Sequence, residues 1–297
     1  MPAWALYVGL VVMWSSGFIG AELGTRAATA DTLLMWRFIA AATVLGTAWL
    51  AVCRHRLTGH AVGRQIVVGA LSQGVYVGSV AWAVALGIPL GTTALIAALQ
   101  PIVAATVTGR LLGEHVRARE WAGLAIGFAG VTLAVKDDLS AAAGAPPAAY
   151  ALPFTGMAGL LLASIVERRS VATMPVADAL PIHVLTSAVL FSAIALATGR
   201  AVPPAEPSFW VAIAWLVGLS TVGAYCFYWL SVRRHGVTRT SSLIYLTPPT
   251  TGIWALLMFG QEPRLLTLAG MAISLIGVLV ATVRATNQRA VRGKVMA

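Results

Sequence analysis

Charged residues are scarce in this chain, and their scarcity limits what kind of protein it can be. Only 10% of the residues are Asp, Glu, Lys or Arg, whereas 59% are hydrophobic. A soluble domain usually carries about 25% charged residues. A chain of 297 residues cannot hide so much apolar surface inside a water-soluble shape, so most of its exterior must face lipid. The composition therefore excludes a soluble globular protein and indicates an integral membrane protein.

Cysteine is almost absent, and acidic residues are half as numerous as basic ones. Cys53 and Cys226 lie in or beside apolar runs without the spacing of metal ligands, so we expect no disulfide and no zinc site. The net charge of +10 would suit nucleic acid. The basic residues lie instead in short loops between apolar runs, where they orient a membrane protein. We expect no cofactor, no metal and no nucleic-acid partner.

Two familiar segments are also missing. No charged region precedes the first apolar run and no clear cleavage site follows it, so we interpret this run as a retained membrane helix and not a signal peptide. No Walker motif is present, so ATP is not expected to drive the protein directly.

Apolar runs of the length that spans a membrane dominate the rest of the chain. A spanning helix needs about 20 mainly apolar residues. Glycines, prolines and charge clusters divide the sequence into ten such runs, in two sets of five. The predicted runs are Trp4–Ala21, Asp31–Val52, Gln65–Leu86, Thr92–Leu112, Glu120–Val135, Ala149–Val166, Ala177–Ala197, Ser208–Leu230, Thr240–Phe259 and Leu266–Val283.

The basic residues predict the orientation of these helices. With the amino terminus inside, every cytoplasmic segment has more Lys and Arg than its neighbours across the membrane, as the positive-inside bias requires. The cytoplasmic residues are Arg54, Arg56, Arg64, Arg110, Arg117, Arg119, Arg168, Arg169, Arg233, Arg234, Arg239, Arg284, Arg289, Arg292 and Lys294. The opposite side receives only Arg26, Lys136, Arg200 and Arg264. We predict a multi-pass protein of a bacterial-type inner (plasma) membrane with both termini cytoplasmic.

One stretch occurs twice, over residues 91–134 and 238–281. Each copy begins as an apolar helix with a proline, leaves the apolar zone through a glutamate, Glu114 or Glu262, and continues to Ala-Gly and Gly-Val pairs. Matched halves indicate a transporter built from internal repeats. An odd number of helices in each half makes the repeats inverted. The predicted domains are a first repeat over 1–139, a linker over 140–148, a second repeat over 149–284 and a basic cytoplasmic tail over 285–297.

These residues resemble the EamA-type domain of the drug/metabolite transporter superfamily. The matching motifs are Trp14-Ser-Ser-Gly-Phe18, Trp36-Arg37-Phe38 and the two helices that end in Gly113-Glu114 and Gln261-Glu262. The second copy has Gln where Gly is expected before the glutamate. The resemblance covers essentially the whole chain and implies ten helices around a central cavity. It also implies export of amino acids or other small metabolites. The chain is further similar to the YddG-like exporters of aromatic and neutral amino acids.

Polar residues at mid-depth are the candidates for substrate binding, because intramembrane polar groups are costly and usually face the bundle interior. They offer hydroxyls, one amide and aromatic faces, with no central carboxylate. Helix packing is the competing interpretation for each serine and threonine. The predicted substrate-binding residues are Trp14, Ser15, Tyr76, Ser79, Gln100, Tyr225, Tyr228, Tyr245 and Thr247.

Three prolines and two basic residues have other predicted roles. Pro101, Pro248 and Pro249 are expected to kink their helices at mid-span, either as hinges or as fixed bends for packing. Arg37 lies about 9 Å inside the outer end of its helix at about 1.5 Å per residue, and either snorkels, guides a substrate carboxylate or forms an outer gate with Glu22 or Asp31. His183 is its inner counterpart, structural or proton-coupling.

Small residues in the fifth and tenth runs are predicted to pack the two helices together, with a dimer contact as the alternative. The stripes are Gly123, Gly127 and Gly130 in one run and Gly270, Ser274 and Gly277 in the other. The protein is expected to be a monomer or a weak homodimer.

The sequence thus predicts a secondary transporter, not an enzyme, that exports small organic solutes by facilitated diffusion. The most favoured solutes are aromatic and other neutral amino acids. Export of another metabolite, a quaternary amine or drug, or a lipid on the same fold stays open, as does proton coupling. An intramembrane serine protease that uses Ser220 with His183 is disfavoured, because Thr221 follows the serine where a small glycine is expected.

Overall fold

A computed structural model describes residues 2–52, 58–100, 103, 118–139, 145–168 and 174–282. These residues form helices and no strand. The helices of the first half are α1 (Ala3–Ala27), α2 (Ala30–Val52), α3 (Gly59–Gly69), the π-helix η1 (Ala70–Val75), α4 (Tyr76–Ala85), α5 (Leu90–Ala97) and α7 (Ala118–Leu139). Those of the second half are the 3-10 helix η2 (Pro147–Tyr150), α8 (Ala151–Arg168), α9 (Val176–Ala197), α10 (Pro207–Trp215), the π-helix η3 (Leu216–Ala224), α11 (Tyr225–Ile244), α12 (Thr247–Phe259) and α13 (Leu265–Thr282).

Six described helical stretches are long and apolar enough to cross a membrane. They are Ala3–Ala27, Ala30–Ala51, Gly59–Ala85, Pro147–Glu167, Val176–Ala197 and Pro207–Arg234. They confirm the first, second, third, sixth, seventh and eighth predicted runs. A shorter apolar helix, Leu265–Gly277, falls in the tenth run. Much of the fourth run, with Pro101, lies outside the described residues, and so does Glu114 just beyond its end.

Two long helices contain a π-helical segment at matching places in the two halves. Residues 59–85 form α3, η1 and α4 in succession, and residues 207–244 form α10, η3 and α11. In both, the π segment ends immediately before a tyrosine, Tyr76 or Tyr225. Such segments are rare and are frequently found at functional sites.

The end of the eighth run differs from its prediction. We expected helices to end at Leu230 and restart at Thr240, but the helical assignment continues to Ile244. The Ser231 and Thr240 hydroxyl oxygens nevertheless lie 2.9 Å apart, although nine residues would span about 13 Å in a straight α-helix. The chain therefore bends back on itself within α11.

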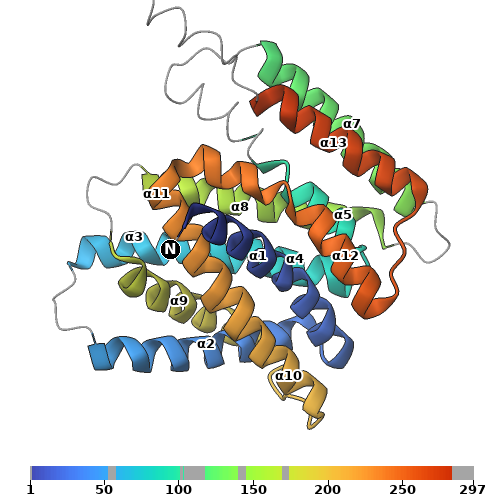
Figure 1. The fold of residues 1–297 in the computed structure, drawn as a ribbon. Coiled ribbons are helices and arrows are strands. Elements are labelled where there is room, and N and C mark those ends of the chain that lie inside the picture. Colours follow the sequence, from blue (N-terminus) through green and yellow to red (C-terminus); the bar gives the residue numbers. More distant parts are fainter. Residues whose placement is uncertain are drawn as a thin grey trace, which may run out of the picture.

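The helices are arranged as a main bundle with one pair at its side. Helices α1, α2, α4, α9, α10 and α11 surround the larger buried core, and α2 lies along α9 (Figure 1). Helices α7 and α13 lie side by side at the edge of the bundle (Figure 1). A Cβ at Gly130 would lie 2.4 Å from the Gly270 carbonyl oxygen, and the Ser274 hydroxyl donates to the Gly127 carbonyl at 2.9 Å. The predicted packing of the small-residue stripes within the chain is confirmed.

Candidate functional site

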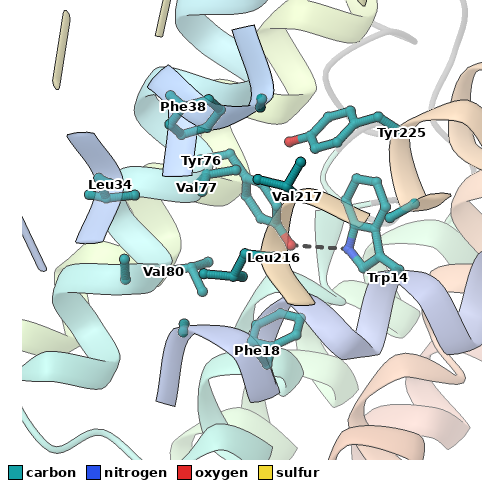
Figure 2. Packing of buried hydrophobic residues seen from close by; sticks show 14 of the residues in the cluster. Trp14, Phe18, Leu34, Phe38, Tyr76, Val77, Val80, Leu216, Val217 and Tyr225 are labelled. Carbon is teal, nitrogen blue, oxygen red and sulfur yellow. Dashed lines mark hydrogen bonds between the residues drawn. The ribbon is translucent and has the colours of Figure 1, made fainter. Parts of the chain in front are cut away.

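Four aromatic side chains from three helices meet at the centre of the bundle. Trp14 on α1 stands between Tyr76 on α4 and Tyr225 and Tyr228 on α11, with ring centroids 5.8, 5.4 and 4.9 Å away. The Trp14 indole Nε1 donates to the Tyr76 hydroxyl at 3.1 Å (Figure 2). All four side chains are buried. We call these four residues the aromatic cluster.

A small cavity adjoins the aromatic cluster. Helices α1, α2, α4, η3 and α11 line it with Trp14, Tyr76, Tyr225 and Arg37, and with apolar side chains such as Leu34. Figure 2 shows Leu34 and the three aromatic side chains. Its volume is about 30 Å³, which is room for roughly one or two water molecules. The lining side chains must therefore separate before a molecule much larger than water can enter.

Arg37 is the cation of this cavity, and it is only 3% exposed. Its Nε donates to the Thr221 hydroxyl at 3.2 Å, and its Nη2 donates to the Ser220 and Thr221 hydroxyls at 3.0 and 3.1 Å. The predicted alternative of a gate with Glu22 or Asp31 is wrong in this conformation. Both carboxylates have other partners, because Glu22 pairs with Arg26 at 2.9 Å and Asp31 with another arginine.

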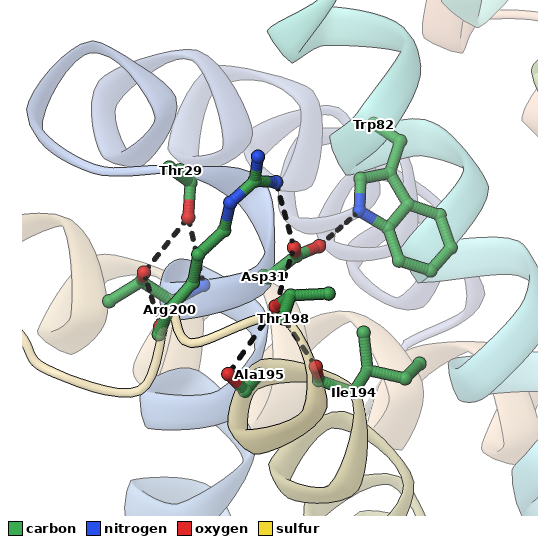
Figure 3. A network of polar contacts seen from close by, with 8 residues as sticks. Thr29, Asp31, Trp82, Ile194, Ala195, Thr198 and Arg200 are labelled. Carbon is green, nitrogen blue, oxygen red and sulfur yellow. Dashed lines mark hydrogen bonds and ion pairs between the residues drawn. The ribbon is translucent and has the colours of Figure 1, made fainter.

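A polar network around Asp31 joins the ends of several helices (Figure 3). One Asp31 carboxylate oxygen accepts from the Trp82 indole at 2.7 Å. The other accepts from the Thr198 hydroxyl at 3.3 Å and pairs with Arg200 at 3.1 Å. The Thr32 hydroxyl adds a bond to the Arg200 carbonyl at 2.7 Å. This network joins α2 and α4 to the segment that follows α9.

A second polar network joins three helices near the opposite end of α9. The His183 Nε2 lies 2.7 Å from Gln65 Oε1, and Gln65 Nε2 donates to Glu167 at 2.8 Å. Gln65 and His183 are buried. Close by, the Trp49 indole donates to Asp178 at 2.9 Å. His183 therefore belongs to a network separate from that of Arg37.

The structure places five further predicted residues apart from the cavity lining, although all are buried. Gln100 interacts with the Tyr228 hydroxyl beneath the aromatic cluster. Ser79 packs against Gly156 of α8. Tyr245 lines a different, apolar groove between α5, α12 and α13. Ser15 on α1 and Thr247 at the start of α12 carry buried hydroxyls without a hydrogen-bond partner in the described structure.

The predicted mid-span proline kink of the ninth run is wrong. The chain leaves the helix at Tyr245 and Leu246, and α12 begins at Thr247, so Pro248 and Pro249 lie in its first turn. A proline there costs no helical hydrogen bond, because the first amide groups of a helix have no intrahelical partner. The first half breaks similarly at Ala98 and Leu99, just before Gln100. Pro101 lies outside the described residues.

Several contacts in and near the candidate site were not predicted from the sequence. Ser220 was considered only as a protease nucleophile. Its hydroxyl accepts from Arg37, whereas His183 faces Gln65, so the pair that a protease needs is not formed. Gln65 could have been identified from the sequence, because an amide within an apolar run is costly and usually faces the bundle interior. Ser164, which lies 3.0 Å from the Tyr228 hydroxyl, carried none that separates it from a packing serine.

Within the described ranges, no group of three or more His, Cys, Asp or Glu could hold a metal ion. No curated protein matches the chain significantly. A crystal structure of a protein with 23% sequence identity superposes with a TM-score of 0.66, over 93% of this chain and 96% of the other. This similarity establishes the fold alone.

The family comparison is more specific. The model of the EamA-like transporter family matches twice, over residues 2–136 and 150–283. The two matches cover both halves, and therefore most of the chain. The chain belongs to the EamA-like transporter family, whose members are multi-pass membrane transporters of small metabolites and not enzymes.

Proposed function

We propose that this chain is a secondary transporter that exports aromatic and other neutral amino acids by alternating access. Ten helices in two inverted sets of five, with both termini in the cytoplasm of a bacterial-type inner membrane, form the framework of this proposal. The observation that carries it is a buried arginine beside the aromatic cluster at the junction of the two halves. Tyr76 and Tyr225, which follow the matched π segments, contribute one residue from each half.

The arginine supports a substrate with a carboxylate. Arg37 is buried, and the hydroxyls of Ser220 and Thr221 that accept from it are neutral. Among the described residues, no carboxylate pairs with its guanidinium. A charge in the membrane interior without a counter-ion is costly, and usually marks an ion or substrate pathway. A substrate carboxylate would supply the missing charge and could bind the guanidinium through two hydrogen bonds.

The aromatic cluster supports an aromatic side chain on the same substrate. Trp14, Tyr76 and Tyr225 line the cavity, and offset rings attract one another beyond simple burial. An aromatic amino acid could place its ring against Trp14 and its carboxylate on Arg37. A quaternary amine fits less well, since the aromatic faces that would attract it lie beside a fixed positive charge.

The apolar groove is the observation that favours a lipid flippase as a second candidate. It has a volume of about 320 Å³ and is lined almost wholly by apolar side chains of α5, α12 and α13. An acyl chain would suit such a lining. Arg37 and the aromatic cluster lie outside it, so this function would leave them without a role.

Counterflow in proteoliposomes tests the proposal and separates these candidates. Vesicles loaded with unlabelled phenylalanine should take up labelled phenylalanine, whereas phenethylamine, which lacks the carboxylate, should compete poorly. Tyr76→Ala and Gln100→Ala should reduce the exchange while membrane insertion stays normal. Equal competition by phenethylamine, or normal exchange in both variants, would show that the site has been assigned wrongly. Movement of a labelled lipid without amino-acid exchange would favour the flippase.

A further inference from the structure

Unpaired polar atoms gather around His183 in the half of the bundle that we assign to the cytoplasmic side. His183 Nδ1, the Ser187 hydroxyl and the Trp229 indole Nε1 are all buried and have no hydrogen-bond partner in the described structure. Ser187 lies one helical turn beyond His183 on α9, and the His183 and Trp229 ring centroids are 6.0 Å apart. Buried polar groups normally find partners, so three unpaired ones in one neighbourhood indicate a site for something small and polar.

The hydrogen bonds of Gln65 fix which nitrogen of His183 is free. The Gln65 amide nitrogen donates to Glu167, so the Gln65 amide oxygen is the atom that faces His183 Nε2. An amide oxygen only accepts, and Nε2 must therefore carry a hydrogen. In the neutral ring, Nδ1 then holds a free lone pair inside the bundle. His183 is thus a base: Gln65 on the neighbouring helix α3 holds its Nε2, and its Nδ1 is available to accept a proton.

We propose that His183 binds the proton that moves inward as the substrate moves outward, so that the chain is a proton-coupled antiporter. This inference rests on the proposed transport function. It replaces the facilitated diffusion expected from the sequence, which was based on the lack of a central carboxylate. A proton adds to Nδ1 and gives an imidazolium, and the Glu167 carboxylate behind Gln65 stabilises that charge. Loss of the same proton to the cytoplasm restores the neutral ring.

Among the charged and titratable groups around His183, Glu167 is the acidic one that is linked to the ring, through Gln65. On α9 itself, Asp178 accepts from Trp49. On α11, Arg233 donates to the Met174 carbonyl, Tyr225 donates to the Ser72 carbonyl and the Tyr228 hydroxyl meets Ser164. On α2, Arg37 is held by the hydroxyls of Ser220 and Thr221. On α3, His60 and Arg64 both precede Gln65 in sequence, and His60 is exposed.

Two helices, α3 and α11, connect His183 to the aromatic cluster, so protonation of His183 can alter the position of the cluster's side chains. On α3, Gln65 lies one turn before Gly69, where a Cβ would come within 2.6 Å of the His183 Cα, so α3 and α9 are in direct contact. The η1 segment and Tyr76 follow in the same continuous helix. On α11, Trp229 packs against Tyr228 with centroids 4.9 Å apart. An indole N–H can only donate, so it can pair with the neutral Nδ1 and not with the protonated one.

Net export from proteoliposomes tests this proposal. Wild-type vesicles loaded with labelled phenylalanine should lose it faster when the outside is made acidic, and a dye inside should report acidification as phenylalanine leaves. For one proton exchanged, a gradient of about one pH unit shifts the final distribution about tenfold. His183→Gln, whose amide can still donate to Gln65, should keep counterflow but lose both gradient effects. His60→Gln is the matched control and should behave as wild type.

Glu167→Gln separates proton binding from a purely structural role. Removal of the stabilising charge should move the pH dependence of net export toward more acidic outside pH, whereas a packing defect would lower the rate equally at every pH. Retained acidification in His183→Gln, or wild-type counterflow without any effect of the gradient, would overturn the antiport.

A readout without substrate covers the case in which phenylalanine is not transported. Imidazolium quenches nearby indole fluorescence, so the wild type minus His183→Gln difference spectrum should titrate as Trp229 responds to His183. A flat difference between about pH 5 and 8, the range in which histidine ordinarily changes its charge, would refute the proton site, whichever substrate is carried.

Discussion

The contact between α7 and α13 allows the effect of one added methyl group to be worked out. In Gly130→Ala the new Cβ would lie 2.4 Å from the Gly270 carbonyl oxygen and 2.6 Å from the backbone nitrogen of Ser274. Both are backbone atoms, so no side-chain rotation can relieve the overlap. An ordinary contact needs roughly 3.4 Å, and the two helices must therefore separate by about 1 Å.

Two costs follow from this separation. Overpacking of a close contact typically costs about 1–3 kcal/mol. The hydrogen bond from Ser274 to the Gly127 carbonyl, now 2.9 Å, would be stretched, and such interhelical bonds contribute about 0.6 kcal/mol in membranes. Together these costs are about 1.6–3.6 kcal/mol. Because alanine also favours a helix over glycine by about 0.5–1 kcal/mol, we expect Gly130→Ala to lower the free energy of unfolding by about 1–3 kcal/mol.

Unfolding of the purified protein in mixed detergent micelles measures this change. Gly46→Ala on α2 is the matched control, because a Cβ there meets nothing within 4 Å. Alanine favours a helix over glycine by about 0.5–1 kcal/mol, so the control should be as stable as wild type or slightly more so. Equal stability of Gly130→Ala and Gly46→Ala would refute the proposed close contact.

Three other variants test the polar contacts. Asp31→Ala removes the acceptor shared by the network in Figure 3. Its effect can be measured in a cysteine-free background with a cysteine introduced at Ala81 in the cavity, which should react faster with a membrane-impermeant thiol reagent added outside. An unchanged rate would mean that the network does not close the site. Asp137→Ala removes the carboxylate that accepts two hydrogen bonds at the start of α13, and should cost about 0.5–2 kcal/mol in the same unfolding assay, as for a lost helix cap. Ser164→Ala should cost no more than about 0.6 kcal/mol but weaken phenylalanine exchange, because the Tyr228 hydroxyl loses one of its partners, at 3.0 Å. Full exchange would argue against a role for this hydroxyl.

The sequence predicted the elements better than their partners. Trp14, Tyr76 and Tyr225 could be identified because polar aromatic groups in apolar runs must face other protein. The partners of Arg37 could not be predicted in the same way. Ser220 and Thr221 are small hydroxyl residues, and these are also common where membrane helices simply pack together, so only the folded geometry reveals the arginine that they hold.

The break before α12 had a different cause. A proline is compatible with a kink inside a helix or with the first turn of a new one. Which of the two occurs depends on whether the preceding residues remain helical. The turn at Tyr245 and Leu246 is set by tertiary packing, and neither residue type indicates a turn in the sequence.

The π segments give the two tyrosines a way to turn without unwinding a helix. A π turn holds more residues than an α turn, and successive residues of an α-helix are about 100° apart around its axis. If the boundary of η1 or η3 moved by one residue, the side chain that follows, Tyr76 or Tyr225, would swing by an angle of that order while its backbone amides stayed bonded along the helix. A rotation of this kind in each half would open or close the narrow space beside Trp14 with little translation of any helix.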